Sequence, residues 1–284
     1  MSAGESSIRQ LAAHDHASLS FLIQNAEYVY RHLDWRPAIE WLGRQPFLGL
    51  DRSRRLVGAL ACPQDATPIR WIRLFSYLDW NETGLLQAWQ SLFAELCRCE
   101  AGQSITIAAL GLQPWFEDLL QNSNFNHPQD IIVLTWQGQM PPERPLAPEI
   151  LLRPMLPADI PDVTVLDRAS FAPLWHQTEP ELEQAFTQAA YATVAEMDRE
   201  IIGYQISTGN PFHAHLARLA VAPALQRLSI GYAIVKDMLE TFVQRGIQNI
   251  SVNTQSDNYA SQALYLKLGF AQTGEAFPVY TFNP

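Results

Sequence analysis

The apolar residues change their period within the second half of the chain. A short run over 216–221 has the spacing of a strand and ends at Pro223. After a polar turn, apolar residues recur at helical spacing, at Ile230, Ile234, Met238 and Phe242. The pattern therefore predicts a strand, a tight loop over 226–231 and a helix over 230–244.

The loop 226–231 (QRLSIG) leaves backbone amides unpaired at the start of the predicted helix. Those amides and the positive end of the helix dipole together favour a bound phosphate. A single loop with one glycine is equally compatible with an ordinary strand-to-helix turn. A second feature is needed to decide between the two interpretations.

That second feature is 257–270 (DNYASQALYLKLGF), which follows after the helix and a predicted strand over 249–254. A further helix is expected over 258–268. Gly269 suits the left-handed position that commonly ends a helix. Asp257 or Ser256 can cap its start.

The two motifs, in this order, resemble those of the GNAT superfamily of N-acyltransferases. The family's acetyl-CoA loop, Gln/Arg-x-x-Gly-x-Gly/Ala, is matched at Gln226 and Gly231, with Ser229 at the usual first glycine. The family's closing helix, Asn-x-x-Ala-x-x-x-Tyr-x-Lys-x-Gly-Phe, is matched at Asn258, Tyr265, Lys267, Gly269 and Phe270, with Ser261 replacing the alanine. The resemblance covers residues 150–282.

The resemblance implies a binding mode for acetyl-CoA as co-substrate, with no metal. In GNAT domains the fourth and fifth strands splay apart, and the pantetheine arm of CoA lies between them. Backbone groups of Leu219 and Val221 would pair with that arm, while the loop amides hold the pyrophosphate. The residues expected at acetyl-CoA are Leu219, Ala220, Val221, Gln226, Arg227, Leu228, Ser229, Ile230, Gly231, Tyr232, Asn258 and Ser261.

The implied chemistry is acyl transfer from a thioester to an amine. The acceptor's neutral amine is the nucleophile, so the site needs proximity, a base and an acid. The leaving thiol has a pKa of roughly 8.5, and a phenol of about 10 is close enough to protonate its thiolate. Tyr265 is the candidate acid; the alternative is a half-buried helical tyrosine whose hydroxyl only meets a backbone partner.

The base is less well defined. Some family members carry a glutamate on the central strand, and the matching position here is Ala217. By alternation His213 and His215 share that strand face, and a histidine has the pKa range of a base near neutrality. Glu196, at the end of the preceding strand, is a third candidate. Strand histidines also serve as polar packing residues, Glu196 could simply flank a turn, and a water relay without one essential base is an equal alternative.

The acceptor groove of GNAT enzymes corresponds to 167–186 here. Trp175 and His176 are the candidate substrate contacts, and Glu179, Glu181 and Glu183 could attract a cation. Acidic residues are also favoured in the first turn of any solvated helix. The second half most resembles the ribosomal-protein N-terminal acetyltransferase branch. A protein N-terminus, a small amine and an amino-acid derivative remain open as acceptors.

The remaining elements of the second half follow the order of the family. Strands are expected over 150–155, 191–196, 201–207, 213–221, 249–254, 271–273 and 279–282, and two further helices within 157–189, joined by a loop over 171–178.

Composition limits the classes of partner. The 284 residues are 48% apolar and 17% charged, with a formal charge of −10 and lysines only at 236 and 267. Such a surface argues against nucleic acid, which needs clustered cations. No signal peptide and no membrane-spanning apolar run are evident. Three cysteines that match no zinc pattern favour a reducing, cytoplasmic compartment.

Prolines at 141, 142, 145 and 148 predict a linker over 138–149, between domains at 1–137 and 150–284. The halves correspond at a nearly fixed offset. Arg73 lies 145 positions before Arg218, Phe125 lies 145 before Phe270, and Arg9 lies 144 before Arg153. A constant register across several elements indicates a duplication. The alternative is an unrelated α/β domain in the first half.

The first copy lacks the chemical residues of the second. Its loop reads NETGLL over 81–86, and Leu120 stands opposite Tyr265. We therefore predict an α/β fold (an α+β mixed sheet) with tandem GNAT-like domains, each a central twisted mixed sheet flanked by helices. The first is expected to be degenerate and the second an N-acetyltransferase. The alternative function is a non-catalytic CoA-binding or protein-interaction module built on two copies. The oligomeric state is left open.

Overall fold

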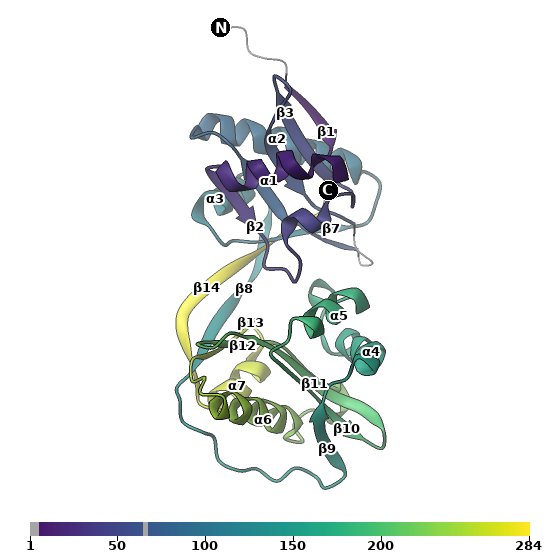
Figure 1. Cartoon of the computed structure of the whole chain (residues 1–284), viewed down its shortest axis with the longest axis vertical. Helices are drawn as coiled ribbons and strands as arrows, with labels where there is room; N and C mark the ends of the chain where they lie inside the picture. The colour runs from purple at the N-terminus through teal and green to yellow at the C-terminus, as the bar shows by residue number, and fades with distance from the viewer. Residues whose placement is uncertain (1–5, 65–67) are drawn as a thin grey trace. The chain divides into compact units, whose positions relative to one another are not determined.

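A computed structural model of the chain describes residues 6–64 and 68–284 (Figure 1). The chain divides into two compact units. Unit 1 comprises Met1–Gln129 with Phe277–Pro284, and unit 2 comprises Asp130–Ala276. The boundary therefore differs from the expected one, because the last eight residues return to unit 1 and the proline-rich segment lies wholly inside unit 2.

Unit 1 alternates strands and helices in the order of a mixed α/β domain. Its elements are β1 (Ser6–Gln10), α1 (His16–Asn25), β2 (Tyr28–Arg31), β3 (Phe47–Arg52), β4 (Arg55–Ala61), β5 (Ile69–Trp71), β6 (Leu74–Tyr77), α2 (Glu82–Cys99), β7 (Thr106–Leu110), α3 (Pro114–Asn122) and the beginning of β8 (Asn126–Trp136).

Unit 2 follows a similar order, with a second helix in place of β2 and one long strand in place of β5 and β6. Its elements are the rest of β8, then β9 (Ile150–Pro154), α4 (Ile160–Ser170), α5 (Glu179–Thr187), β10 (Tyr191–Met197), β11 (Glu200–Gly209), β12 (Ala214–Val221), α6 (Ile230–Gln244), β13 (Ile250–Gln255), α7 (Tyr259–Lys267) and most of β14 (Phe270–Phe282). The helix predicted over 230–244 is confirmed at both ends. The two predicted closing strands were wrong in one respect, because they form one continuous strand, β14.

The duplication is visible in matching ion pairs. In unit 1, Arg9 donates to both oxygens of Asp15, at 2.8 and 2.9 Å, and to Asp51 at 2.7 Å. In unit 2, Arg153 donates to both oxygens of Asp159, at 2.7 and 3.0 Å, and its Nε donates to a carboxylate on β10 at 2.7 Å. Each arginine holds the pKa of its bidentate aspartate below the usual range. The predicted two-copy fold is therefore confirmed in side-chain detail.

The units exchange their last strands. Residues 131–135 of β8 pair antiparallel with β13 of unit 2, and residues 279–282 of β14 pair antiparallel with β7 of unit 1. Each unit therefore completes its sheet with a segment that continues from the other half of the sequence. Leu134 and Trp136, brought in by β8, lie in the apolar core of unit 2.

Helices cover both faces of the unit 2 sheet (Figure 1). Adjacent residues of β11 point to opposite faces, as the strand period requires. Gly203 faces Ile234 of α6, whereas the Tyr204 hydroxyl donates to Asp167 of α4. The sheet is therefore buried between α6 and α7 on one side and α4 and α5 on the other.

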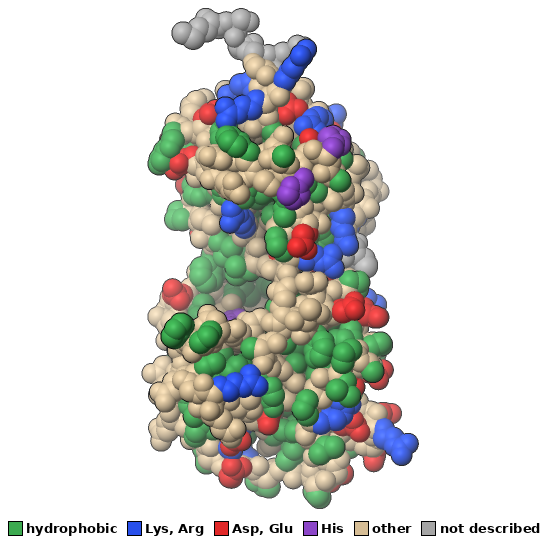
Figure 2. Space-filling model, viewed as in Figure 1, with side chains coloured by type: hydrophobic (Ala, Val, Ile, Leu, Met, Phe, Trp, Pro, Cys, Tyr) green, Lys and Arg blue, Asp and Glu red, His purple; other side chains and the backbone are tan. Residues whose placement is uncertain are grey.

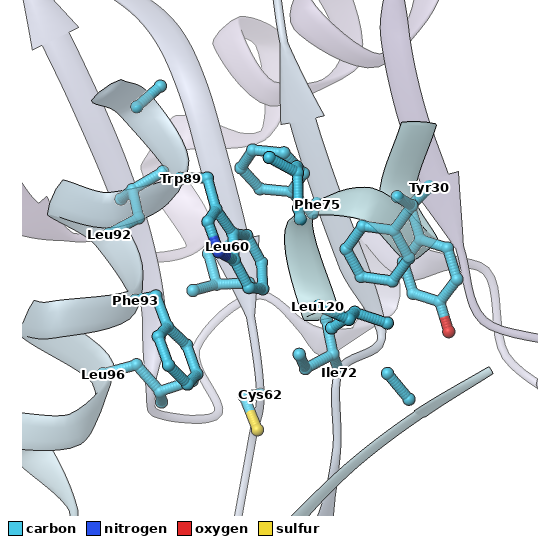
Figure 3. Close-up of a cluster of buried hydrophobic side chains, with 14 of the residues drawn as sticks. Tyr30, Leu60, Cys62, Ile72, Phe75, Trp89, Leu92, Phe93, Leu96 and Leu120 are labelled. Carbon is cyan, nitrogen blue, oxygen red and sulfur yellow. The ribbon is translucent and has the colours of Figure 1, made fainter. Parts of the chain in front are cut away.

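The core of unit 1 is rich in aromatic side chains (Figure 3). Trp89 and Phe93 stack at 5.1 Å along α2, and Trp89 meets Phe75 edge-on at 5.1 Å. Leu120, the residue opposite Tyr265, is fully buried in this cluster. Not every tryptophan is internal, because Trp80 is 82% exposed.

The segment 138–149 is an extended strap on unit 2 and not a linker between units. The Tyr232 hydroxyl of α6 donates to the Pro142 carbonyl at 2.8 Å, and Lys236 donates to Glu143 at 2.6 Å. The guanidinium of Arg144 lies 4.6 Å from the centre of the Tyr232 ring. The prolines keep this strap extended, and its neighbours on α6 hold it in place.

Candidate functional site

The central feature of unit 2 is a gap that opens between two parallel strands. β12 and β13 pair at Ala214–Ile250, His215–Ser251 and Leu216–Val252, and the pairing ends there. β12 continues to Val221 and β13 to Gln255. A bulge at Ala217, where the pairing with β11 skips one residue, marks the point of divergence. Beyond it, the facing edges of the two strands are not paired with each other, and we call the space between these edges the slot.

Backbone groups of β12 are directed into this slot. The Ala222 amide donates to the Ile202 carbonyl of β11 at 2.8 Å. By alternation, the polar groups of Leu219 and Val221 point away from β11, toward the slot. The Val221 carbonyl accepts the Gln226 side chain at 3.2 Å and the Ser170 hydroxyl at 3.4 Å. The predicted contacts of Leu219 and Val221 with a pantetheine arm stay a prediction, and the Val221 carbonyl already has partners within the chain.

The loop after β12 adopts an unusual backbone. Arg227 and Ser229 have φ values of 69° and 65°, both in the left-handed region. Ser229 is the residue before the first turn of α6, and it occupies the position where the family usually has glycine. Alternation of left-handed and right-handed residues is the backbone geometry that turns successive amides toward one side, and such an arrangement at a helix start favours anions.

Gly231 lies in the tightest part of this loop. A Cβ at this position would lie 3.3 Å from Leu264 Cδ2 of α7 and 3.6 Å from Val221 Cγ2. The start of α6 therefore packs closely between α7 and β12. Leu228 is 56% exposed and Ile230 is buried, so the loop presents one apolar side chain to solvent and anchors the next.

The start of α7 is capped by Asn258, and not by the expected Asp257 or Ser256. Its side-chain oxygen accepts the Ser261 amide at 3.1 Å. Asn258 and Ser261, both predicted to contact acetyl-CoA, therefore form the start of α7, just after β13. Gly269 has φ 85° and ends the helix as expected.

Tyr265 lies on α7 in the core of unit 2, with its ring 5.7 Å from that of Phe270. Burial raises the pKa of this phenol above its usual value, so it is protonated at neutral pH. Tyr265 is 4% exposed, and no hydrogen-bond partner of its hydroxyl is seen among the described residues.

The two strand histidines share one partner. His215 Nδ1 lies 2.9 Å and His213 Nε2 3.0 Å from the Ser251 hydroxyl of β13. Burial, and then the neighbouring His213, lower the pKa of His215 to about 4. His215 is consequently neutral at physiological pH, and it lies where β12 and β13 are still paired.

The third candidate base is held in an ion pair. The Glu196 carboxylate accepts the Arg153 Nε at 2.7 Å on β10, two strands away from the slot. Asp51 has the same role in unit 1. Glu196 is thus part of the duplicated structural network and is not brought together with Tyr265.

The predicted acceptor residues lie on a segment between α4 and α5. The His176 Nε2 donates to the Phe171 carbonyl at 2.9 Å, and the Trp175 carbonyl accepts Arg218 at 2.6 Å. Glu181 accepts the amide and hydroxyl of Thr178 at 2.8 and 3.0 Å, so it caps α5 and is not free for a cation. The sequence missed the buried Asp167–Arg218 pair; an arginine within an apolar strand is the signal that could have revealed it.

Unit 1 has the same divergence, but its slot is filled. β5 and β7 pair at Ile69–Thr106, Arg70–Ile107 and Trp71–Ala108, and the chain then diverges as in unit 2. There β2 pairs antiparallel with β6 along its whole length, on the opposite side from β4. The chain also enters α2 directly at Glu82, without a loop of left-handed residues.

Two features are absent from the part of the chain that the structure describes. Residues 6–64 and 68–284 contain no group of three or more His, Cys, Asp or Glu side chains arranged to hold a metal. No helix in that same part of the chain is long and apolar enough to cross a membrane. On the face shown in Figure 2, lysine and arginine side chains are scattered among acidic and apolar ones.

Comparison with known proteins relates this geometry to a family. The model of the acetyltransferase (GNAT) family matches residues 160–270. No curated protein matches the chain by sequence.

Three solved structures extend over nearly the whole chain. A probable N-acyltransferase of unknown function from Enterococcus faecalis V583 is 9% identical, with a TM-score of 0.74 over 98% of this chain and 72% of that one. A tandem GNAT protein from the clavulanic acid biosynthesis pathway is 16% identical, with a TM-score of 0.62 over 98% of both chains. A GCN5-related N-acetyltransferase from Sphaerobacter thermophilus is 13% identical, with a TM-score of 0.62 over 98% of this chain and 95% of that one.

At these identities the structural likeness shows the fold, and the family model applies to the residues that it matches. Residues 160–270 form a domain of the acetyltransferase (GNAT) family, and the whole chain has the fold of two GNAT-like domains in tandem.

Proposed function

We propose that unit 2 is an acetyl-CoA-dependent N-acetyltransferase that acts on a primary amine, either a protein N-terminus or a small molecule. The observation that carries this proposal is the open slot between β12 and β13, with the left-handed loop 226–231 at its end. Unit 1 has neither feature, so we assign it no catalytic role.

The residues present fit acetyl-CoA in two ways. The amides of the loop at the start of α6 offer donors and a positive helix end to a pyrophosphate. The unpaired edge of β12 at Leu219 offers a peptide-like donor and acceptor to an amide-bearing arm. When bound, acetyl-CoA supplies an acyl group activated as a thioester.

The protein then contributes position and proton transfer. The slot orients the arm so that its acyl carbon faces the acceptor amine, which converts a bimolecular reaction into an oriented one. The Tyr265 hydroxyl donates its proton to the departing thiolate. His215 is a weak base, given its pKa of about 4, and Glu196 is held by Arg153. His213 shares the Ser251 hydroxyl with His215. We therefore assign the removal of the amine proton to water.

Titration with acetyl-CoA followed by thiol release across a panel of primary amines tests the proposal. The panel should include a short peptide with a free N-terminus, a polyamine and an amino-acid amide. Thiol release that depends on an amine supports the proposal. Absence of acetyl-CoA binding contradicts it.

A second function, a non-catalytic CoA-binding module, is favoured by one observation. The central strand has Ala217 where some family members have a glutamate, and the candidate carboxylate Glu196 is held by Arg153. Tight binding of acetyl-CoA without thiol release on any amine of the panel favours this second function.

A further inference from the structure

A buried ion pair connects β12 to α4 beside the slot. Arg218 donates from Nε to Asp167 Oδ2 at 2.7 Å and from Nη2 to Oδ1 at 2.9 Å. The Tyr204 hydroxyl donates to the same carboxylate at 2.5 Å. Asp167 is completely buried, and the Arg218 side chain is 12% exposed. Such a bidentate pair with a further donor fixes the geometry of both partners.

The same pair fixes the segment 171–177, which leads from α4 to α5. Arg218 Nη2 donates to the Trp175 carbonyl at 2.6 Å, and its guanidinium lies 3.7 Å from the centre of the Phe171 ring. The Gln177 amide donates to Asp167 Oδ1 at 3.1 Å. One ion pair therefore holds this segment at its beginning, middle and end.

The duplicated copy shows another path for the corresponding segment. In unit 1 the residues that follow α1 form β2, which pairs with β6 in the slot. Arg73, the counterpart of Arg218, pairs there with Asp34 at 3.2 Å and lies 4.8 Å from the centre of the Trp41 ring. The positions 144 and 145 before Asp167 are Ile23 and Leu22, which cannot pair with an arginine.

The partner of the arginine thus differs between the copies in a way that matches the path of the chain. In unit 2 the carboxylate lies on the helix before the segment, and the segment does not pair with β12 as a strand. In unit 1 it comes from Asp34, after β2, and β2 lies in the slot.

We propose that Arg218 is a positioning residue, which by pairing with Asp167 holds residues 171–177 outside the slot and so keeps the slot open to acyl-CoA. This inference rests on the proposed function for the identity of the ligand. It concerns residues that contact the segment and not the reacting atoms.

The test compares three variants by acetyl-CoA titration and by hydrogen exchange of the peptide covering 171–177. Arg218→Met removes one partner and leaves a buried carboxylate, which destabilises a protein. The double variant Arg218→Met with Asp167→Leu removes both charges and preserves apolar packing. Arg218→Lys keeps the positive charge but loses the bidentate contact with the Asp167 carboxylate.

In the single and the double variant that carry Arg218→Met, the backbone amides of 171–177 should exchange hydrogen faster than in the wild type. If the segment then occupies the slot in about nine of ten molecules, the apparent Kd for acetyl-CoA rises by about tenfold. Arg218→Lys should give an intermediate Kd at nearly wild-type Tm. The matched control is Arg73→Met in unit 1, which should lower Tm while leaving the Kd within about twofold of wild type.

The results separate positioning from a merely structural role. The proposal is overturned if the loss of affinity for acetyl-CoA is proportional to the fall in Tm in every variant, Arg73→Met included. Wild-type affinity together with wild-type exchange in the double variant also overturns it. If the wild-type protein itself fails to bind acetyl-CoA, the proposed function is wrong. Hydrogen exchange of 171–177 then tests the role of Arg218 by itself. Faster exchange in the variants that carry Arg218→Met supports the proposal that Arg218 holds the segment, and unchanged exchange contradicts it.

Discussion

The Leu110 amide of β7 donates a hydrogen bond of 3.2 Å to the Tyr30 hydroxyl of β2. Tyr30 also pairs through its backbone with Phe75 of β6, so one residue spans both strands that diverge in unit 1. Its ring stacks on Phe116 of α3 at 3.9 Å and is fully buried. β2 therefore satisfies backbone groups of β6 and, through the Tyr30 hydroxyl, the Leu110 amide of β7, whereas no strand pairs with β12 on this side beyond Leu216 in unit 2.

This relationship gives a physical account of how a duplicated fold could lose a binding site. An unpaired strand edge inside a domain leaves polar groups that need a partner. Unit 1 supplies that partner from its own chain, and it retains an apolar core around it. Unit 2 leaves the partner to be supplied by a ligand.

Substitution at Ser229 should separate backbone strain from chemistry. Its φ of 65° suits glycine and is poorly tolerated by a β-branched side chain. We expect Ser229→Val to lower stability by about 1–2 kcal/mol and to weaken acetyl-CoA binding. Ser229→Gly should bind at least as tightly as wild type. Calorimetric titration and thermal unfolding measure both effects; equal affinity in the two variants would show that loop conformation is not limiting.

Tyr265→Phe should keep acetyl-CoA binding and lower turnover. The hydroxyl acts only when the thiolate leaves, so it stabilises the transition state more than the ground state. General acid catalysis contributes about 10²–10⁴-fold, which is the expected loss in kcat. The ring and its contact with Phe270 remain.

Cofactor titration and thiol release at saturating acetyl-CoA, with the most active amine of the panel, measure the two effects on Tyr265→Phe. Turnover within about twofold of wild type removes Tyr265 as the acid. Loss of acetyl-CoA binding would instead show that the Tyr265 hydroxyl contacts the cofactor or stabilises the core.

The exchange of strands predicts which fragment of the chain folds. Residues 150–284 lack β8, and with it the core residues Leu134 and Trp136. We expect this fragment to be insoluble or unfolded. The fragment 130–276, which keeps β8 and the strap, should fold and bind acetyl-CoA. Circular dichroism and titration compare the two; a folded, fully active 150–284 fragment would refute the structural role of β8.

Acid should destabilise the protein through buried histidine. Burial lowers the pKa of His215 to about 4, against 6.5 when unperturbed. The unfolded chain therefore binds the proton first as the pH falls, and stability is lost between these two values. The free energy of unfolding should fall by up to about 3 kcal/mol over that range from this group. Burial also lowers the pKa of His32, which adds to the same trend.

Urea unfolding of the wild type and of His215→Asn across this pH range tests that assignment. The variant should lose less stability on acidification than the wild type. An identical pH dependence of the two proteins would place the effect elsewhere.

Local pattern predicted much of unit 2. The helix over 230–244, the break at Pro223 and the end at Gly269 depend on residues close in sequence, and all are observed. The offset between Arg9 and Arg153 predicted a duplication, and their ion pairs confirm it. The identities of the slot and loop residues came from the resemblance, and the structure gives their geometry.

The local sequence pattern could not predict which segments pair when they lie far apart in the sequence. The segment 28–31 (YVYR) has the composition of a strand, but nothing local says that its partner is β6. The same holds for the choice of Asp167 or Asp34 as the partner of a strand arginine, since these carboxylates lie far from it in sequence. Prolines at 138–149 predicted extended backbone correctly, but could not show that the strap packs on α6.

The central claim is that unit 2 holds an open acyl-CoA slot and unit 1 a closed one. Calorimetric titration of the full chain with acetyl-CoA tests it most directly, with Gly231→Trp as the variant that fills the loop between α6, α7 and β12. The account predicts one site per chain in the wild type and none in Gly231→Trp. Two sites of similar affinity, or a site that survives Gly231→Trp, would contradict it.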